Sequence, residues 1–80
     1  MKESHIQSKK IKELEAQGYY VIKLIKTNKN GIPDLIAIPK NSDVLFIEVK
    51  GPNGKTSPLQ DFRLEELENH GIKTEVHKPI

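Results

Sequence analysis

Val44-Leu45-Phe46-Ile47-Glu48-Val49-Lys50 is the stretch that decides the fold of this chain of 80 residues. Side chains alternate between the two faces of a β-strand, which places Leu45, Ile47 and Val49 on one face and Val44, Phe46, Glu48 and Lys50 on the other. A strand that is apolar on both faces near its start belongs inside a sheet. The two charges at its end then lie at the rim of the core, where their desolvation is costly.

Outward from this strand, local patterns predict two helices and three further strands. Aromatic and β-branched runs indicate the strands, and clusters of Asn, Gly and Pro indicate the loops. In chain order, the predicted elements are a helix over 4–17, strands over 19–26, 34–38 and 44–50, a helix over 58–70 and a strand over 72–77. Loops are expected over 27–33 and 51–56, and a turn at Asn41-Ser42-Asp43.

Both helices carry capping signals. Ser4 with Gln7 matches a capping box, and Gly18 is a suitable residue just beyond the end of the first helix. Ser57 followed by Pro58 matches an N-cap and a first helical position. The order α-β-β-β-α-β therefore predicts an α/β (α+β) fold in which two helices flank a sheet.

Length and composition limit the architecture. Eighty residues suffice for one domain, which we expect to cover 1–80, and its core would be thin. The chain has no cysteine, which excludes disulfides and zinc sites built from thiolates. We therefore expect a homodimer, because a second copy would add to the surface that is buried.

Charge and hydropathy suggest the setting. Residues 1–30 carry seven lysines against three glutamates, a balance of +4, whereas residues 61–80 carry three basic and five acidic side chains, a balance of −2. A basic amino-terminal third suits a polyanion, although a solvated lysine-rich helix face gives the same pattern. No apolar run approaches the roughly 20 residues of a membrane span, and no signal peptide follows Met1. We expect a soluble, cytoplasmic protein.

Asp34, Glu48 and Lys50 break the burial pattern and form the candidate site. If their two strands are neighbours, Asp34 and Glu48 project from the same face. A carboxylate pair suits Mg²⁺, which would polarise a phosphoryl oxygen and generate hydroxide near neutral pH. Lys50, on that face, would orient or deprotonate water or stabilise developing charge. The simpler interpretation is a structural Glu48–Lys50 ion pair, with Asp34 as an ordinary strand-start residue.

Residues from both helices could complete this site. Gln60 and Arg63 fall within the apolar arc of the second helix, which is formed by Leu59, Phe62, Leu64 and Leu67. Gln60 could instead form a capping box with Ser57, and Arg63 could contact a phosphate or extend its stem over apolar surface. Glu3 shares a side with apolar residues of the first helix, although a glutamate there is also favoured by the helix dipole.

These residues resemble a known family. Pro33-Asp34 followed by Glu48-Val49-Lys50, in this element order, resembles the PD-(D/E)XK nuclease superfamily, whose restriction-endonuclease-like core has a central mixed sheet flanked by two helices. The VRR-NUC (virus-type replication-repair nuclease) family combines a helical Glu, Gly-x-Pro-Asp, Glu-Val-Lys and Ser-Pro-x-Gln. The chain supplies Glu3, Gly31-Ile32-Pro33-Asp34, Glu48-Val49-Lys50 and Ser57-Pro58-Leu59-Gln60, so the resemblance covers nearly its whole length.

The resemblance implies a metal-dependent enzyme that hydrolyses phosphodiester bonds. Asp34 and Glu48 would bind Mg²⁺ together with the carbonyl of Val49, and Mn²⁺ would substitute for it. Glu3 would assist the metal site. Catalysis would need no small-molecule cofactor and no membrane.

Two further roles and a substrate follow from the same resemblance. Lys50 would be the catalytic lysine, and Gln60 would position water or Lys50. Stand-alone members of this length resemble phage-type homodimers that act on four-way DNA junctions. The expected function is therefore that of a Holliday-junction resolvase in a phage or bacterial host cell, a preference that comes from family analogy.

Other functions remain open from the sequence. A nickase of duplex or flap DNA would use the same active site. A nucleic-acid-binding module would keep the fold without cleavage, although it would gain nothing from charges at the rim of the core. A structural or partner-binding domain would show neither magnesium binding nor salt-dependent DNA affinity. Zinc hydrolysis is disfavoured because His5, His70 and His77 lie on different elements and lack HExxH spacing.

Overall fold

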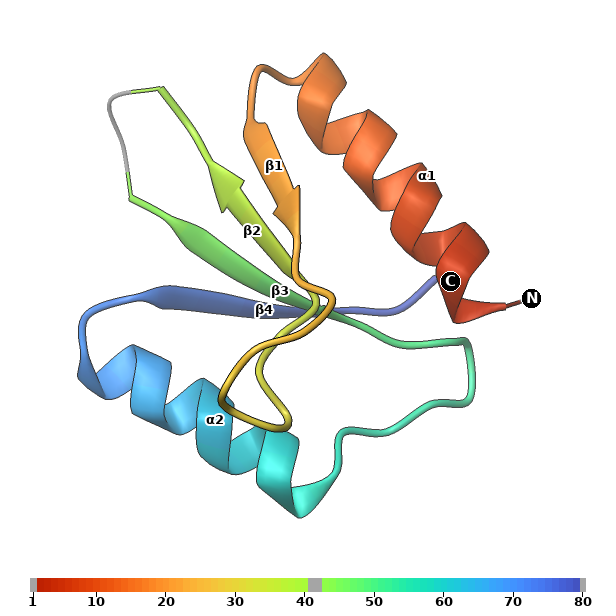
Figure 1. Ribbon diagram of the computed structural model, residues 1–80. Helices are drawn as coiled ribbons and strands as arrows, with labels where there is room; N and C mark the ends of the chain where they lie inside the picture. The colour runs from red at the N-terminus through yellow and green to blue at the C-terminus, as the bar shows by residue number, and fades with distance from the viewer. Residues whose placement is uncertain (1, 41–42, 80) are drawn as a thin grey trace.

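The computed structural model describes residues 2–40 and 43–79. Along the chain its elements are α1 (Glu3–Ala16), β1 (Tyr20–Lys23), β2 (Leu35–Ile38), β3 (Leu45–Val49), α2 (Pro58–Asn69) and β4 (Lys73–His77) (Figure 1). This confirms the predicted order α-β-β-β-α-β. Asn41 and Ser42 of the predicted turn lie outside the described residues. Over the described ranges, no helix is both long enough and apolar enough to cross a membrane.

The four strands form one sheet in the order β1-β2-β3-β4. β1 pairs with β2 and β2 with β3 in antiparallel fashion, whereas β3 and β4 are parallel. The parallel pair is possible because the segment that contains α2 carries the chain back along the sheet between these strands. The sheet is therefore mixed, as expected, and β3 lies inside it.

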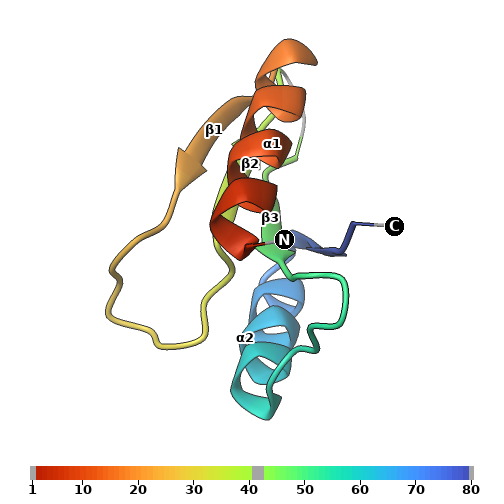
Figure 2. The same cartoon turned by 90° about the vertical axis from the view of Figure 1, so that its right-hand side faces the viewer.

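The core lies between α1 and one face of the sheet (Figures 1 and 2). Its buried side chains are Ile6, Leu14, Leu35, Ala37, Ile47 and Val49. The other face is covered less completely, because α2 packs mainly against β4 and contributes no fully buried side chain. The apolar arc predicted for α2 is therefore wrong in part, since Leu59 and Phe62 are exposed.

The two helices begin differently. α2 begins at Ser57 with the predicted capping box. α1 begins at Glu3, one residue earlier than expected, with Lys2 at the N-cap and no side-chain hydrogen bond to the cap. The predicted capping box of Ser4 with Gln7 is wrong, because Ser4 already lies inside the first turn.

β1 is shorter than the strand predicted over 19–26 and ends at Lys23. The backbone N–H of Leu24 still donates to the carbonyl of Asp34 at 2.8 Å. β2, its pairing partner, begins at Leu35, which lies opposite Lys23. The pairing with β2 therefore ends β1 at Lys23, and the loop that leads to the candidate site begins earlier than predicted.

Gly31 lies where this loop meets α2. Its φ of +80° is in the left-handed region, and a Cβ added there would lie 2.8 Å from Cγ of Leu59. Gly31→Ala is expected to lower the free energy of unfolding by about 1 kcal/mol through backbone strain and by about 1–2 kcal/mol more through the contact. Urea denaturation would measure the sum.

Gly18→Ala is the matched control for this substitution. Gly18 has a φ of +97°, and apart from its chain neighbours no atom of residues 2–40 or 43–79 lies within 4 Å of its added Cβ, so only the backbone strain should appear. Adding Leu59→Ala to Gly31→Ala should recover the additional loss. Equal losses for the two glycine variants would show that the side chain of Leu59 moves aside without cost.

Candidate active site

The register between β2 and β3 places Asp34 opposite Glu48. Leu35 pairs with Ile47 in the antiparallel ladder, so the next position brings Asp34 and Glu48 face to face. Directly opposed side chains in such a pair have Cβ atoms about 4.5–5.5 Å apart. Oδ2 of Asp34 accepts a hydrogen bond from the backbone N–H of Val49 at 2.8 Å, which holds this carboxylate against β3.

Glu48 is the buried centre of the site, with 2% of its surface exposed. Its Oε2 lies 3.6 Å from Nζ of Lys50 and 3.3 Å from Nε2 of Gln60. Within the described part of the chain, its Oε1 is buried without a hydrogen-bond partner. Burial first, and then the Asp34 carboxylate, raise the pKa of Glu48 to about 8, against the smaller lowering effect of Lys50. A bound cation would relieve this costly arrangement.

Gln60 makes two contacts with the two ends of its amide. Its Oε1 accepts from the N–H of Ser57 at 2.9 Å, and Oγ of Ser57 accepts from the N–H of Gln60 at 3.1 Å, which completes the capping box. This leaves Nε2 to donate to Glu48. The two interpretations that the sequence left open are therefore compatible, because the cap orients the amide that holds Glu48.

The backbone around Val49 also favours a ligand. The N–H of Lys50 donates to the carbonyl of His77 on β4 at 2.9 Å, so the carbonyl of Val49 points the other way, toward β2. Extending the β2–β3 register by two positions beyond the Leu35 pair places Pro33 opposite Val49. Proline has no N–H to donate. The carbonyl of Val49 therefore lacks the donor that strand pairing would otherwise supply.

These oxygens fit a divalent cation. Mg²⁺ is bound in proteins by one or two carboxylates, with waters and substrate oxygens completing its shell. Over residues 2–40 and 43–79, no three His, Cys, Asp or Glu side chains gather closely enough to hold an ion, so the set is Asp34, Glu48 and a carbonyl. Glu3 is exposed in the first turn of α1 and does not join them, and its assisting role stays a prediction.

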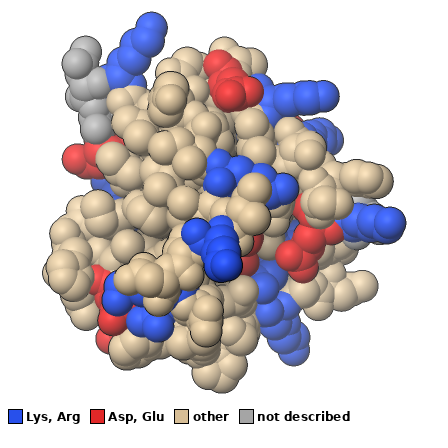
Figure 3. Space-filling model, in the orientation of Figure 1, with Lys and Arg blue, Asp and Glu red and all other residues tan. Residues whose placement is uncertain are grey.

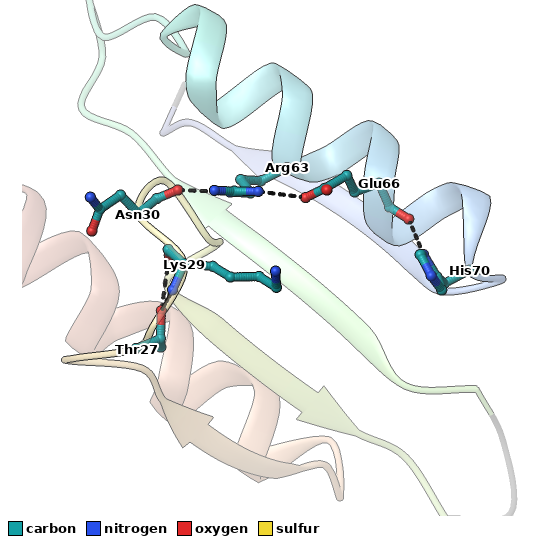
Figure 4. A network of polar contacts seen from close by, with 6 residues as sticks. All are labelled: Thr27, Lys29, Asn30, Arg63, Glu66 and His70. Atoms are coloured by element: carbon teal, nitrogen blue, oxygen red, sulfur yellow. Dashed lines mark hydrogen bonds and ion pairs between the residues drawn. The ribbon is translucent and has the colours of Figure 1, made fainter.

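Arg63 ties α2 to the loop that leads into Asp34 (Figure 4). Its Nε donates to the backbone carbonyl of Asn30 at 2.9 Å, and its guanidinium lies 2.8 Å from Oε1 of Glu66. The hydrogen bond from Arg63 is the main cause that lowers the pKa of Glu66. This guanidinium therefore fixes the loop, a role that the sequence did not reveal because a backbone acceptor leaves no side-chain signal.

Comparison with known proteins supports one assignment. A family model described as the VRR-NUC domain matches residues 2–78. A solved structure described as a VRR_NUC domain has a TM-score of 0.81 and 32% identity, with 92% of this chain and 81% of that chain covered. A second, described as a VRR_NUC domain protein, has a TM-score of 0.83 and 24% identity over 100% of this chain and 80% of that chain, which shows the fold.

A curated phage protein extends the comparison. It is "Putative nuclease p44" of Acyrthosiphon pisum secondary endosymbiont phage 1, 31% identical over 61 residues. The match covers 75% of this chain but 64% of the relative, so the chain spans less than two thirds of that protein. The family match extends over nearly every residue, and the mixed αβββαβ fold agrees with it. The chain therefore belongs to the VRR-NUC domain family.

Proposed function

We propose that this chain is a magnesium-dependent endonuclease that hydrolyses phosphodiester bonds in DNA. Asp34, Glu48 and the carbonyl of Val49 would hold the ion. The observation that carries the proposal is Oε1 of Glu48, a buried carboxylate oxygen that has no donor among the described residues and belongs to the residue opposite a second carboxylate. Membership of the VRR-NUC family supports the nuclease class.

The side chains around the carboxylates have distinct tasks in this proposal. A bound Mg²⁺ would supply a Lewis acid for the phosphoryl group. Lys50, whose Nζ lies 3.6 Å from Glu48, would stabilise negative charge that develops on a phosphoryl oxygen or hold the attacking water. Gln60 holds Oε2 of Glu48 and so leaves Oε1 for the ion. Mn²⁺ should replace Mg²⁺, because it accepts the same oxygen ligands.

A four-way DNA junction cut by a homodimer is the substrate and assembly that we propose. Symmetric cleavage of two strands needs two active sites, which a twofold dimer supplies. Tyr20 is 70% exposed on the sheet face that α1 does not cover, and Ile22 on that face and Phe62 on α2 are also exposed. Exposed apolar surface of this kind favours a protein partner, and a second copy would bury it.

The test is cleavage of a labelled four-way junction and of a linear duplex with Mg²⁺, Mn²⁺ or EDTA. Metal-dependent cleavage confined to the junction would support the resolvase function. Light scattering would measure separately whether the protein forms a dimer. Cleavage of the linear duplex or of a flap substrate would keep the nuclease and remove the junction preference. Binding without cleavage under every condition would indicate a non-catalytic nucleic-acid-binding module.

Gln60→Ala is expected to reduce activity more than stability. The variant loses half of the capping box, which costs about 1 kcal/mol of unfolding free energy. It also loses the donor that orients Glu48, and removing such a support of a metal ligand lowers activity about 10- to 100-fold. Initial cleavage rates and melting temperatures would compare the two losses.

Two further variants separate the tasks of this amide. Ser57→Ala breaks the capping box but leaves Gln60 able to reach Glu48, so it should lose stability and keep its cleavage rate. Gln60→Glu keeps an oxygen for the cap and loses the N–H donor, so it should lose rate and keep stability. If Ser57→Ala slows cleavage as much as Gln60→Ala does, Gln60 is only a cap.

A further inference from the structure

The loop between β1 and β2 projects from the sheet (Figure 2). Residues of this loop line a pocket beside the candidate site. The pocket has a volume of about 260 Å³, and Lys26, Thr27, Lys29 and Gly31 are among the residues that line it. Asp34 also lines it. Because Asp34 is a proposed metal ligand, a group that occupies this pocket would lie next to the reacting phosphate.

This loop is held in place before any ligand binds. Oγ1 of Thr27 accepts from the N–H of Lys29 at 3.1 Å and donates to the carbonyl of Lys29 at 2.9 Å. Arg63 holds the carbonyl of Asn30 from α2 (Figure 4). A loop that is already fixed loses little conformational entropy on binding, which favours a recognition surface over a passive connection.

Charge distinguishes the two sides of the site. The loop segment 24–33 carries Lys26 and Lys29 and no acidic residue, whereas α2 carries one Asp and three Glu against Arg63. Both lysines are exposed, and among the described residues neither lies within ion-pair distance of a carboxylate. Figure 3 shows that positive and negative side chains are interspersed over the face seen in Figure 1. The positive charge of the loop is therefore local and is not part of a broad basic surface. A polyanion that approaches Asp34 would meet attraction at the loop and repulsion at α2.

We propose that this loop pocket binds the DNA phosphates next to the cleaved bond, with Lys26 and Lys29 as the cationic contacts. The assignment rests on the nuclease function proposed above and names the surface that holds its substrate. Ile25 is 87% exposed next to Lys26 and adds an apolar surface against which a deoxyribose can pack. Contacts of this kind carry no direct sequence information, which suits a nuclease that selects DNA by shape.

The experiment compares the wild-type chain with the double variant Lys26→Gln/Lys29→Gln. Binding of a labelled four-way junction is measured with Ca²⁺ in place of Mg²⁺, over a series of salt concentrations. The double variant should bind about tenfold more weakly, and its log–log salt slope should fall by about 2, one unit for each lost phosphate contact. In Mg²⁺, KM should rise while kcat stays unchanged.

Lys12→Gln/Lys40→Gln is the matched control, because it removes the same charge elsewhere. Lys12 is exposed on α1, and Lys40 follows β2 at the end opposite Asp34. Equal weakening of binding in the two double variants, or a lower kcat with an unchanged KM, would overturn the loop assignment. Wild-type protein that binds no DNA would overturn the nuclease function as well. Wild-type binding that Lys26→Gln/Lys29→Gln leaves undiminished would overturn the pocket alone.

Discussion

Lys50→Ala is expected to reduce cleavage by about a thousandfold while DNA binding stays close to that of the wild type. The side chain of Lys50 is buried, and its ammonium lies beside Glu48, where negative charge would develop on a phosphoryl oxygen. One buried cation adds little to an affinity that many phosphate contacts share. Single-turnover cleavage and equilibrium binding of the same junction would measure the two effects separately.

Metal binding and stability provide the controls for Lys50→Ala. An ammonium group repels a cation, so its removal should leave Mn²⁺ binding intact or tighter. Because the raised pKa of Glu48 keeps that carboxyl mostly protonated at neutral pH, loss of its ion pair should cost the metal-free protein little stability there. Lys55→Ala, an exposed lysine in the following loop, should cleave normally. Parallel loss of binding and cleavage in Lys50→Ala would contradict the catalytic role.

Elements set by local signals were predictable from the sequence, and those set by neighbouring strands were less so. Ser57 and Pro58 start α2 because a cap and a fixed φ act within one turn. The end of β1 depends on its pairing with β2, which begins at Leu35 and which no pattern within β1 reveals. The exposure of Phe62 likewise depends on where α2 packs, which a 3.6-residue period does not specify.

The candidate site was predictable as far as strand alternation reaches. Alternation places Glu48 and Lys50 on one face, and the β2–β3 pairing brings Asp34 opposite Glu48. The sequence offered Gln60 either as a site residue that positions water or Lys50 or as a capping-box residue. Its donation to Glu48 was not predicted, because sequence spacing does not give the direction of an amide. The hydrogen bond from Arg63 to the loop was not predictable, since its acceptor is the backbone carbonyl of Asn30.

Metal binding is expected to weaken steeply as the pH falls below about 8. Burial and the neighbouring Asp34 raise the pKa of Glu48 to about 8, so the metal-free protein carries a proton there at neutral pH. A cation must displace that proton, which makes its apparent affinity fall about tenfold for each pH unit below this pKa. Calorimetric titration with Mn²⁺ at several pH values would give the slope.

The same proton affects the stability of the metal-free protein with a defined sign. Folding raises the pKa of Glu48 from 4.5 to about 8, so the folded chain binds the proton more tightly than the unfolded chain does. This stabilising contribution is complete below about pH 4.5 and is lost as the pH rises through about 8, by at most about 1.4 kcal/mol per pH unit. The glutamine side chain of Glu48→Gln does not titrate. The unfolding free energy of this variant, measured relative to the wild type, should therefore increase as the pH rises from about 4.5 to about 8.

Asp34→Asn distinguishes Glu48 from other titrating groups. The Asp34 carboxylate is one of the causes that raise the pKa of Glu48 in the folded chain. Its neutralisation should therefore lower the pH at which the decline in unfolding free energy ends and make the total decline smaller. Glu48→Gln should abolish that decline and also remove the metal site. If Glu48→Gln still binds Mn²⁺ with a tenfold change in affinity per pH unit, the displaced proton belongs to another group, and Oε1 of Glu48 is not the ligand that the buried geometry favours.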